Sequence, residues 1–239
     1  MRAIPYVCLS LLGLFGCASS VNDYLVEARR GDPESVQEAV VNVGRLLREK
    51  EERGVPYDKG DEDAVKYLTE VAEIGKDAVN RASAVDNLSH LRRPRLTSLY
   101  VRRLEDKSWS VQLDAAKALA RNPDPEAVPA LSKRLLDEIR LEVRLEVVKA
   151  LTAIGGEESL KSLLDAFLDP SGRYAGIQLT VYDGARKLSG KDYGQGDRER
   201  WRRYRSERFP TPKEPSASAS AGSPDAEKKP LPGTIPERS

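Results

Sequence analysis

The sequence predicts an all-α fold, an α-solenoid in which helical hairpins stack side by side over residues 23–209. Three observations predict it. Apolar residues recur at helical spacing, short turn-forming breaks separate the helical segments, and one helix pattern repeats along the second half of the chain. Neither helix of a predicted hairpin has enough apolar residues to bury on its own, so neighbouring hairpins must share one continuous core.

Residues 1–16 have the order of regions expected of a secretory signal. Arg2 precedes an apolar run from Ala3 to Gly16, which is shorter than the ~20 residues that a membrane-spanning helix needs. Leu14-Phe15-Gly16-Cys17 resembles the lipobox of bacterial lipoproteins, although Phe15 stands where a small or β-branched residue is usual. The alternatives are an ordinary signal peptide and a buried apolar helix.

The lipobox resemblance implies that Cys17 carries diacylglycerol and palmitate and that residues 17–22 form an acylated linker. Cys8 would leave with the signal. Ala18, following the acylated cysteine, implies sorting to the outer membrane of the bacterial envelope, with the protein facing the periplasm. Several acyl chains hold a protein firmly in a bilayer. No other cofactor is expected.

The first helical segments are bounded by capping residues. Asp32-Pro33-Glu34 is typical of a helix start, and the apolar residues that follow it at helical spacing are Val36, Val40, Val43 and Leu47. Asp61 is expected to cap a second helix that ends at Gly75. Ala78 to Leu91 is then its antiparallel partner.

The repeat is clearest in the second helices of the hairpins. Residues 109–119 align with 141–151, and residues 143–154 align in turn with 177–188, so the small residues Ala118, Ala150 and Gly184 fall at one position. Small residues there would let adjacent helices approach closely. The helix preceding each repeats too and ends at an acid, namely Asp106, Asp137 or Asp169. Residues 177–182 alternate as a strand would, but the repeat register assigns them to a helix.

These repeats resemble the HEAT family, and its bacterial HEAT-like branch in particular. The family pattern is an acid at the turn, then Val-Arg, a small residue and Ala-Leu. Asp137, Val143-Arg144 and Ala150-Leu151 match it. The resemblance covers residues 94–188 and implies that Asp137 and Arg144 belong to a polar ladder between repeats. The helices before residue 94 are expected to be divergent units.

The end of the folded part resembles the terminal motif of bacterial HEAT-repeat lipoproteins. Residues 188–194 read Leu-Ser-Gly-Lys-Asp-Tyr-Gly, and a helix containing Trp201 follows. The last apolar face of a solenoid has no neighbour and must be covered, which Trp201, Tyr204 and Phe209 are suited to do. Residues 210–239 are rich in Pro, Ser and Ala and are expected to form a disordered tail.

Composition narrows the possible chemistry. Lys plus Arg is 39 against 38 Asp plus Glu, and the chain has one histidine, His90, and two cysteines. This composition rules out most catalysis that is built on His pairs, Cys-His dyads or zinc clusters. His90 is expected to be a surface or turn residue. The sequence therefore predicts no catalytic residues, no metal site and no enzymatic activity.

The expected site is a binding surface for an unidentified envelope protein. On the repeat register, charged residues of the second helices point away from the core, and the basic segment after residue 197 adds three arginines; the candidates are Asp114, Lys117, Arg121, Glu146, Lys149, Asp183, Lys187, Arg198, Arg202 and Arg205. A membrane-anchored, non-enzymatic scaffold is the preferred interpretation, without nucleic acid. The alternatives are a HEAT-like lyase that handles a bilin chromophore and, if the signal is not used, a basic HEAT-like nucleic-acid-binding protein.

Overall fold

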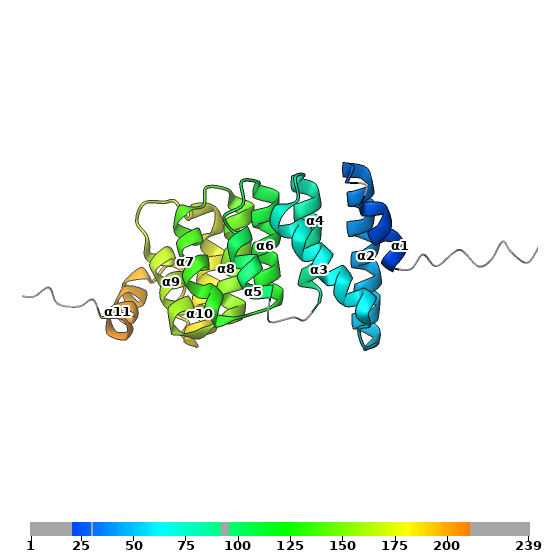
Figure 1. Cartoon of the computed structure of the whole chain (residues 1–239). Coiled ribbons are helices and arrows are strands. Elements are labelled where there is room, and N and C mark those ends of the chain that lie inside the picture. The colour runs from blue at the N-terminus through cyan, green and yellow to red at the C-terminus, as the bar shows by residue number, and fades with distance from the viewer. Residues whose placement is uncertain (1–20, 30, 92–95, 211–239) are drawn as a thin grey trace, which may run out of the picture.

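The computed structural model describes residues 21–29, 31–91 and 96–210, and these contain helices and turns but no strand (Figure 1). Helices pack side by side along one axis, which confirms the predicted all-α solenoid. The predicted signal at 1–16, the predicted acylation site at Cys17 and residues 211–239 of the predicted tail lie outside the described residues.

The helices form two rows. The first helices of the hairpins are α1 (Val21–Ala28), α3 (Lys59–Ile74), α5 (Thr97–Arg103), α7 (Val128–Asp137) and α9 (Gly156–Leu168). The second helices are α2 (Pro33–Arg53), α4 (Ala78–Ser89), α6 (Trp109–Arg121), α8 (Leu141–Ile154) and α10 (Gln178–Ser189). Two 3₁₀ turns, η2 (Pro125–Ala127) and η3 (Ala175–Ile177), precede α7 and α10, and α11 (Arg198–Arg208) covers the end of the array.

The helix starts follow from side-chain caps. The Asp32 carboxylate accepts a hydrogen bond from the Ser35 amide at 2.9 Å, as predicted for α2. The prediction for α3 is wrong by a few residues, because Asp58 is the cap and Asp61 is its partner. The Asp58 and Asp61 side chains each accept from the other's backbone amide, at 3.0 and 2.9 Å, which forms a reciprocal capping box.

Close approaches in the second-helix row depend on glycine. A Cβ built on Gly44 of α2 would lie 2.1 Å from the Asn87 side chain of α4, and one built on Gly184 of α10 would lie 2.5 Å from Thr152 Oγ1 of α8. Ala118 and Ala150 are fully buried. These observations support the role predicted for the small repeat positions, and α10 places residues 178–182 in a helix.

The polar ladder uses a different acid from the predicted one. Asp137 is exposed, whereas Glu138 is 5% exposed and accepts hydrogen bonds from the amides of Ile139 and Arg140. The reason is local: α7 ends at Asp137, and the extended backbone of Glu138 turns its side chain beneath the start of α8. Arg144 does contribute, because its guanidinium donates to the backbone oxygens of Glu138 and Arg173.

A second rung joins α4 to the turn after α5. The Arg81 guanidinium donates to both carboxylate oxygens of Asp106, at 3.0 and 2.8 Å, and to the carbonyl oxygen of Gly75. Both charged side chains are buried. Burial would raise the pKa of Asp106, but the hydrogen bonds from Arg81 and from the Ser108 amide outweigh it and hold that pKa below its usual value. The rung locks two adjacent hairpins together.

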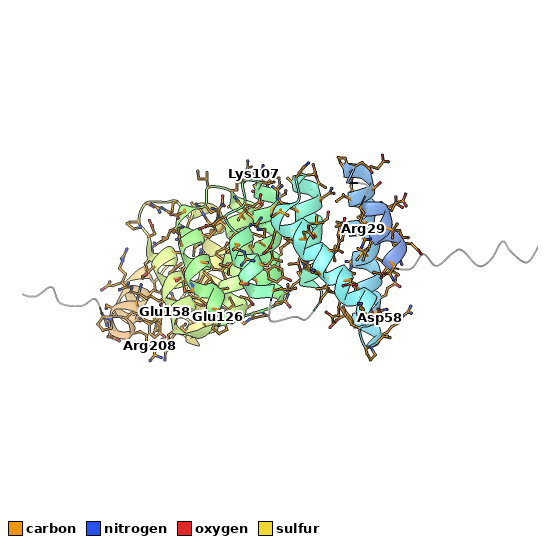
Figure 2. All side chains as sticks on the ribbon, viewed as in Figure 1. Arg29, Asp58, Lys107, Glu126, Glu158 and Arg208 are labelled. Carbon is orange, nitrogen blue, oxygen red and sulfur yellow. The ribbon has the colours of Figure 1, made fainter. Side chains whose placement is uncertain are left out.

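The turns lie at two opposite edges of the array. Turns within a hairpin gather at the edge marked by Lys107 in Figure 2, and turns between hairpins gather at the edge marked by Asp58, Glu126 and Glu158. Arg208, at the end of α11, lies toward this second edge. The described chain therefore ends near the start of α9.

Candidate functional site

The charged strip predicted on the second helices is largely neutralised by its own members. Lys117 donates to Asp114 at 2.9 Å on α6, and Lys149 donates to Glu146 at 2.6 Å on α8. Burial raises the pKa of Asp114, while the Lys117 hydrogen bond acts in the opposite direction. These four residues lie on adjacent, packed helices, as expected.

The two ends of the strip differ. Arg121 reaches from α6 to α4, where its guanidinium donates to Asp86 at 2.8 Å and to the hydroxyl of Ser89 at 2.7 Å. On α10, Asp183 lies 3.5 Å from Arg186 in a weaker pair. Lys187 is exposed and forms no ion pair with a described residue. The strip thus offers few charges that a partner could use without first breaking an existing contact.

Two of the three candidate arginines of α11 hold the helix in place. Arg198 donates to the Phe167 carbonyl oxygen at 2.8 Å and lies 5.3 Å from the Phe167 ring centroid. Arg205 donates to Asp165 at 2.7 Å. Of the three candidates, only Arg202 is exposed. Two of the three candidate arginines are therefore engaged in attaching α11 to α9.

Aromatic rings close the end of the array. Trp201 is 0% exposed and packs edge-on against Tyr182, Tyr193 and Tyr204, with centroid distances of 6.0, 5.1 and 6.1 Å. Its indole N–H donates to the Gly194 carbonyl oxygen at 3.1 Å. This arrangement confirms the capping role predicted for Trp201 and Tyr204.

His90 follows the last residue of α4, where its ring nitrogen lies 3.8 Å from Asp86. Burial and the nearby Arg121 charge lower its pKa. Among the described residues, no group of three His, Cys, Asp or Glu side chains is placed to hold a metal ion. His90 thus lies at the end of a helix, as the sequence predicted.

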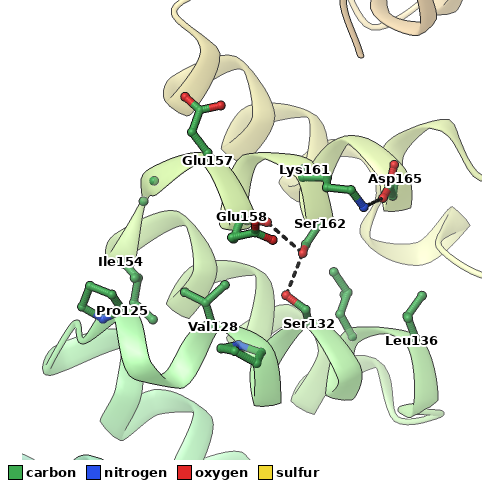
Figure 3. Close-up of a pocket in the computed structure, with 14 residues that line it drawn as sticks. Pro125, Val128, Ser132, Leu136, Ile154, Glu157, Glu158, Lys161, Ser162 and Asp165 are labelled. Atoms are coloured by element: carbon green, nitrogen blue, oxygen red, sulfur yellow. Dashed lines mark hydrogen bonds and ion pairs between the residues drawn. The ribbon is translucent and has the colours of Figure 1, made fainter. Parts of the chain in front are cut away.

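A groove that the sequence did not predict lies between α7 and α9, in the first-helix row (Figure 3). Its volume is about 630 Å³, which is within the range of known ligand sites. The walls are mainly apolar and include Val128 and Leu136 of α7 and Ile154 at the end of α8. Leu136 is 55% exposed, so an apolar surface faces solvent.

Small residues keep the groove open. Gly155 and Gly156 form the turn into α9 with φ values of +73° and +82°, a conformation that other residues rarely adopt. Deeper along the groove, the hydroxyls of Ser132 and Ser162 are 2.6 Å apart and join the two helices (Figure 3). Neither serine is large enough to fill the space between α7 and α9.

The rim of the groove is mostly acidic. Glu157 and Glu158 stand at the start of α9, and Lys161 donates to Asp165 one turn further on (Figure 3). Arg208 of α11 forms two hydrogen bonds with the Glu157 carboxylate, at 2.9 and 2.5 Å, and these lower the Glu157 pKa. Glu158 forms no ion pair with a described residue. The Glu158 carboxylate is therefore the rim acid that could attract a cationic group without first breaking an existing ion pair.

Sequence reasoning overlooked this groove, although one signal was available. The apolar residues of α7 that face the core are Val128, Leu131 and Leu135. Leu136 lies outside that register, and the pair Gly155-Gly156 marks an unusual turn nearby. An apolar residue off the buried face is weak evidence alone, because single exposed aliphatics are common.

These features define an array of helical repeats with a capped end and an apolar groove between α7 and α9. Residues 96–178 match the family model of HEAT repeats, so this part of the chain has the repeats that its sequence resembles. Comparison with curated proteins returned no significant match. No helix in the described ranges has the length and apolar character needed to cross a bilayer.

Among solved structures, the chain is similar to the complex of CpcE and CpcF of phycocyanin lyase from Nostoc sp. PCC7120. The match has a TM-score of 0.57 and 20% sequence identity, and it covers 80% of this chain and 70% of the other. At this identity the likeness concerns the fold.

This match corrects the expectation that the chain is not an enzyme. That expectation rested on the scarcity of reactive side chains such as His and Cys and on the predicted secretory signal. A solved structure with a similar fold is a lyase complex, so the fold itself occurs in an enzyme. The same structure is a complex of two subunits, which is consistent with protein partners for folds of this kind.

Proposed function

We propose that this chain is a membrane-anchored HEAT-like array that binds a segment of another protein of the bacterial envelope in the groove between α7 and α9. The apolar groove is the observation on which the proposal depends. It combines exposed apolar walls with one rim carboxylate, Glu158, that forms no ion pair with a described residue, features suited to an apolar segment that has a nearby Lys or Arg. The charged strip is a poorer site, because its charges are already paired.

A pair of variants tests the groove. Leu136→Glu places a charge on the groove wall, whereas Ile139→Glu makes the same change at a residue that is 91% exposed and outside the groove. Envelope proteins are crosslinked to each variant in cells, purified with it and identified by mass spectrometry. We expect one partner to be lost with Leu136→Glu and kept with Ile139→Glu. Equal recovery from both variants would refute the groove as the site.

Membrane anchoring and an outer-membrane location are part of this proposal and rest on the lipobox-like sequence at Cys17. Radiolabelled palmitate should be incorporated into the wild-type protein and be absent from Cys17→Ser. Membrane fractionation of the same two proteins should move the variant from the outer-membrane to the soluble fraction. No label in the wild type would reject the anchor and leave the groove proposal to its own test.

A lyase or chromophore-handling role is a second candidate, supported by the similarity to the phycocyanin lyase complex. The groove volume of about 630 Å³ is sufficient for a small organic ligand. Titration with a bilin, followed by visible absorption, tests this candidate. A spectral shift with the wild type that Leu136→Glu abolishes would favour it, and an unchanged spectrum would exclude bilin binding in the groove.

A further inference from the structure

We propose that the C-terminal segment of this same chain, residues 228–236, docks in the groove between α7 and α9 and competes with an external partner there. The docking is inferred from the position of α11, from the apolar spacing in the two elements and from charge. Its regulatory meaning rests on the proposed function. The docking of the segment does not depend on the proposed function.

The first argument is position. Arg208 is bonded to Glu157, and Glu157 lines the groove, so the described chain ends beside one mouth of the groove. Arg205 is bonded to Asp165, which lines the groove further along α9. α11 thus delivers the chain beyond residue 210 to the place where the groove opens. Twenty-one residues separate Pro210 from Leu231, and a random-coil linker of that length has a root-mean-square span of about 25 Å, so reach is not limiting.

The second argument is apolar spacing. Beyond residue 210, Leu231 and Ile235 are the only large aliphatic residues, and they lie in the sequence Lys228-Lys-Pro-Leu-Pro-Gly-Thr-Ile-Pro236. In the extended polyproline conformation, four residues span roughly 12 Å. Along α7, the eight helical steps from Val128 to Leu136 rise by roughly the same 12 Å. Two aliphatic side chains at this spacing match apolar walls at both ends of the groove.

The third argument is charge. Lys228 and Lys229 immediately precede the apolar part of the segment. Glu157 and Glu158 stand at the mouth of the groove, and Glu158 forms no ion pair with a described residue. Opposite charges near the groove favour one orientation of the segment, with its lysines toward the start of α9.

Covalent attachment makes such docking effective even when the contact itself is small. A segment on a short flexible linker has an effective concentration of about 1 mM at its site. An external partner must then displace the segment before it can bind. The tail would act as an internal competitor that sets a threshold for the partner.

Site-specific photocrosslinking in the full chain tests the docking. A benzophenone amino acid replaces Leu136, and the monomeric product is digested with trypsin and analysed by mass spectrometry. We expect crosslinks to the peptide containing Leu231 and Ile235. The double variant Leu231→Asp/Ile235→Asp should reduce their yield about tenfold, whereas the matched control Ala217→Asp/Ala221→Asp should leave it unchanged.

Each other outcome overturns the proposal. Crosslinks that fall elsewhere, or that persist equally in both double variants, would mean that the segment does not dock by its aliphatic residues. A mixture of isotopically light and heavy chains identifies crosslinks between two copies, and a predominance of these would assign the groove to a second molecule. Circular dichroism of each variant verifies that the array is folded.

The regulatory consequence has a separate readout. With the partner recovered in the Leu136→Glu experiment, the double variant Leu231→Asp/Ile235→Asp should increase partner crosslinking several-fold. If intramolecular docking is found but no partner is lost with Leu136→Glu, the proposed function fails and the docking stands. If a partner is lost with Leu136→Glu but crosslinks to the C-terminal segment are absent, the docking proposal fails and the proposed function stands.

Discussion

Removing the aromatic side chain that closes the array should destabilise it strongly. Trp201 is fully buried, touches rings from α9, α10 and α11, and donates one hydrogen bond to Gly194. Truncating such a residue to alanine costs about 3–5 kcal/mol, since it removes apolar burial and leaves a cavity. We therefore expect Trp201→Ala to lower the free energy of unfolding by about this amount.

The second tryptophan of the chain provides the matched control. Trp109 is 43% exposed at the start of α6, where the Arg140 guanidinium lies 5.2 Å from its ring centroid. Trp109→Ala should cost only about 1 kcal/mol, because it loses a partly exposed cation–π contact and little buried area. Trp201→Phe should recover much of the alanine deficit and lack the indole hydrogen bond, worth about 0.5–1.5 kcal/mol.

Urea unfolding followed by far-ultraviolet circular dichroism measures these differences. Hydrogen exchange then locates them. Because each repeat contacts only its neighbours, the damage from Trp201→Ala should appear first in α9 and α10 and leave α4 protected. The reasoning would be refuted if Trp201→Ala cost no more than Trp109→Ala, or if the added exchange were spread evenly over the array.

Three further predictions concern the contacts between hairpins. In urea unfolding, Asp106→Asn should lower the free energy of unfolding by about 3–5 kcal/mol, because it leaves Arg81 buried without its counter-ion. The control Asp137→Asn, at an exposed site, should change that free energy by about 0.5 kcal/mol or less. Because the folded-state pKa of Asp106 is lowered, its contribution to stability is complete above the unfolded-state pKa of about 3.9 and is lost as the pH falls through the folded-state pKa. The urea midpoint of Asp106→Asn should therefore fall less steeply with acid than that of the wild type. Parallel plots of midpoint against pH for the two proteins would contradict this. Gly184→Ala should cost about 1–3 kcal/mol by overpacking against Thr152, and adding Thr152→Ala should relieve part of that cost; strictly additive effects in the double-mutant cycle would show that the two side chains do not clash.

The repeat register predicted the second-helix row well, because the same physical requirement recurs at each unit. Ala118, Ala150 and Gly184 are buried where adjacent helices approach closely. The assignment of residues 178–182 to a helix followed from that register against a local alternation typical of a strand. A repeated pattern carries information about the neighbour of each helix, which a local propensity does not.

The details that sequence reasoning missed depend on side-chain direction at turns. Glu138 replaces Asp137 in the polar ladder because one extended residue after α7 changes which acid points inward. Similarly, Arg198 and Arg205 belong to a basic segment in the sequence, yet each is bonded to α9 or the residues that follow it. Charge patterns predict exposure, and only three-dimensional placement identifies which charges are already paired.

The groove follows from the same packing that builds the array. Small residues such as Ala150 and Gly184 draw the second helices together, and α8 and α10 pack directly on one another. The first helices must then be kept apart or be joined by side chains of matching size. Between α7 and α9, Ser132 and Ser162 join the helices by a hydrogen bond but fill little space, so Leu136 is left half exposed. The groove therefore lies where side chains only partly fill the space between two first helices. None of its lining residues belongs to a recognisable catalytic motif, so a search for such motifs would not find it.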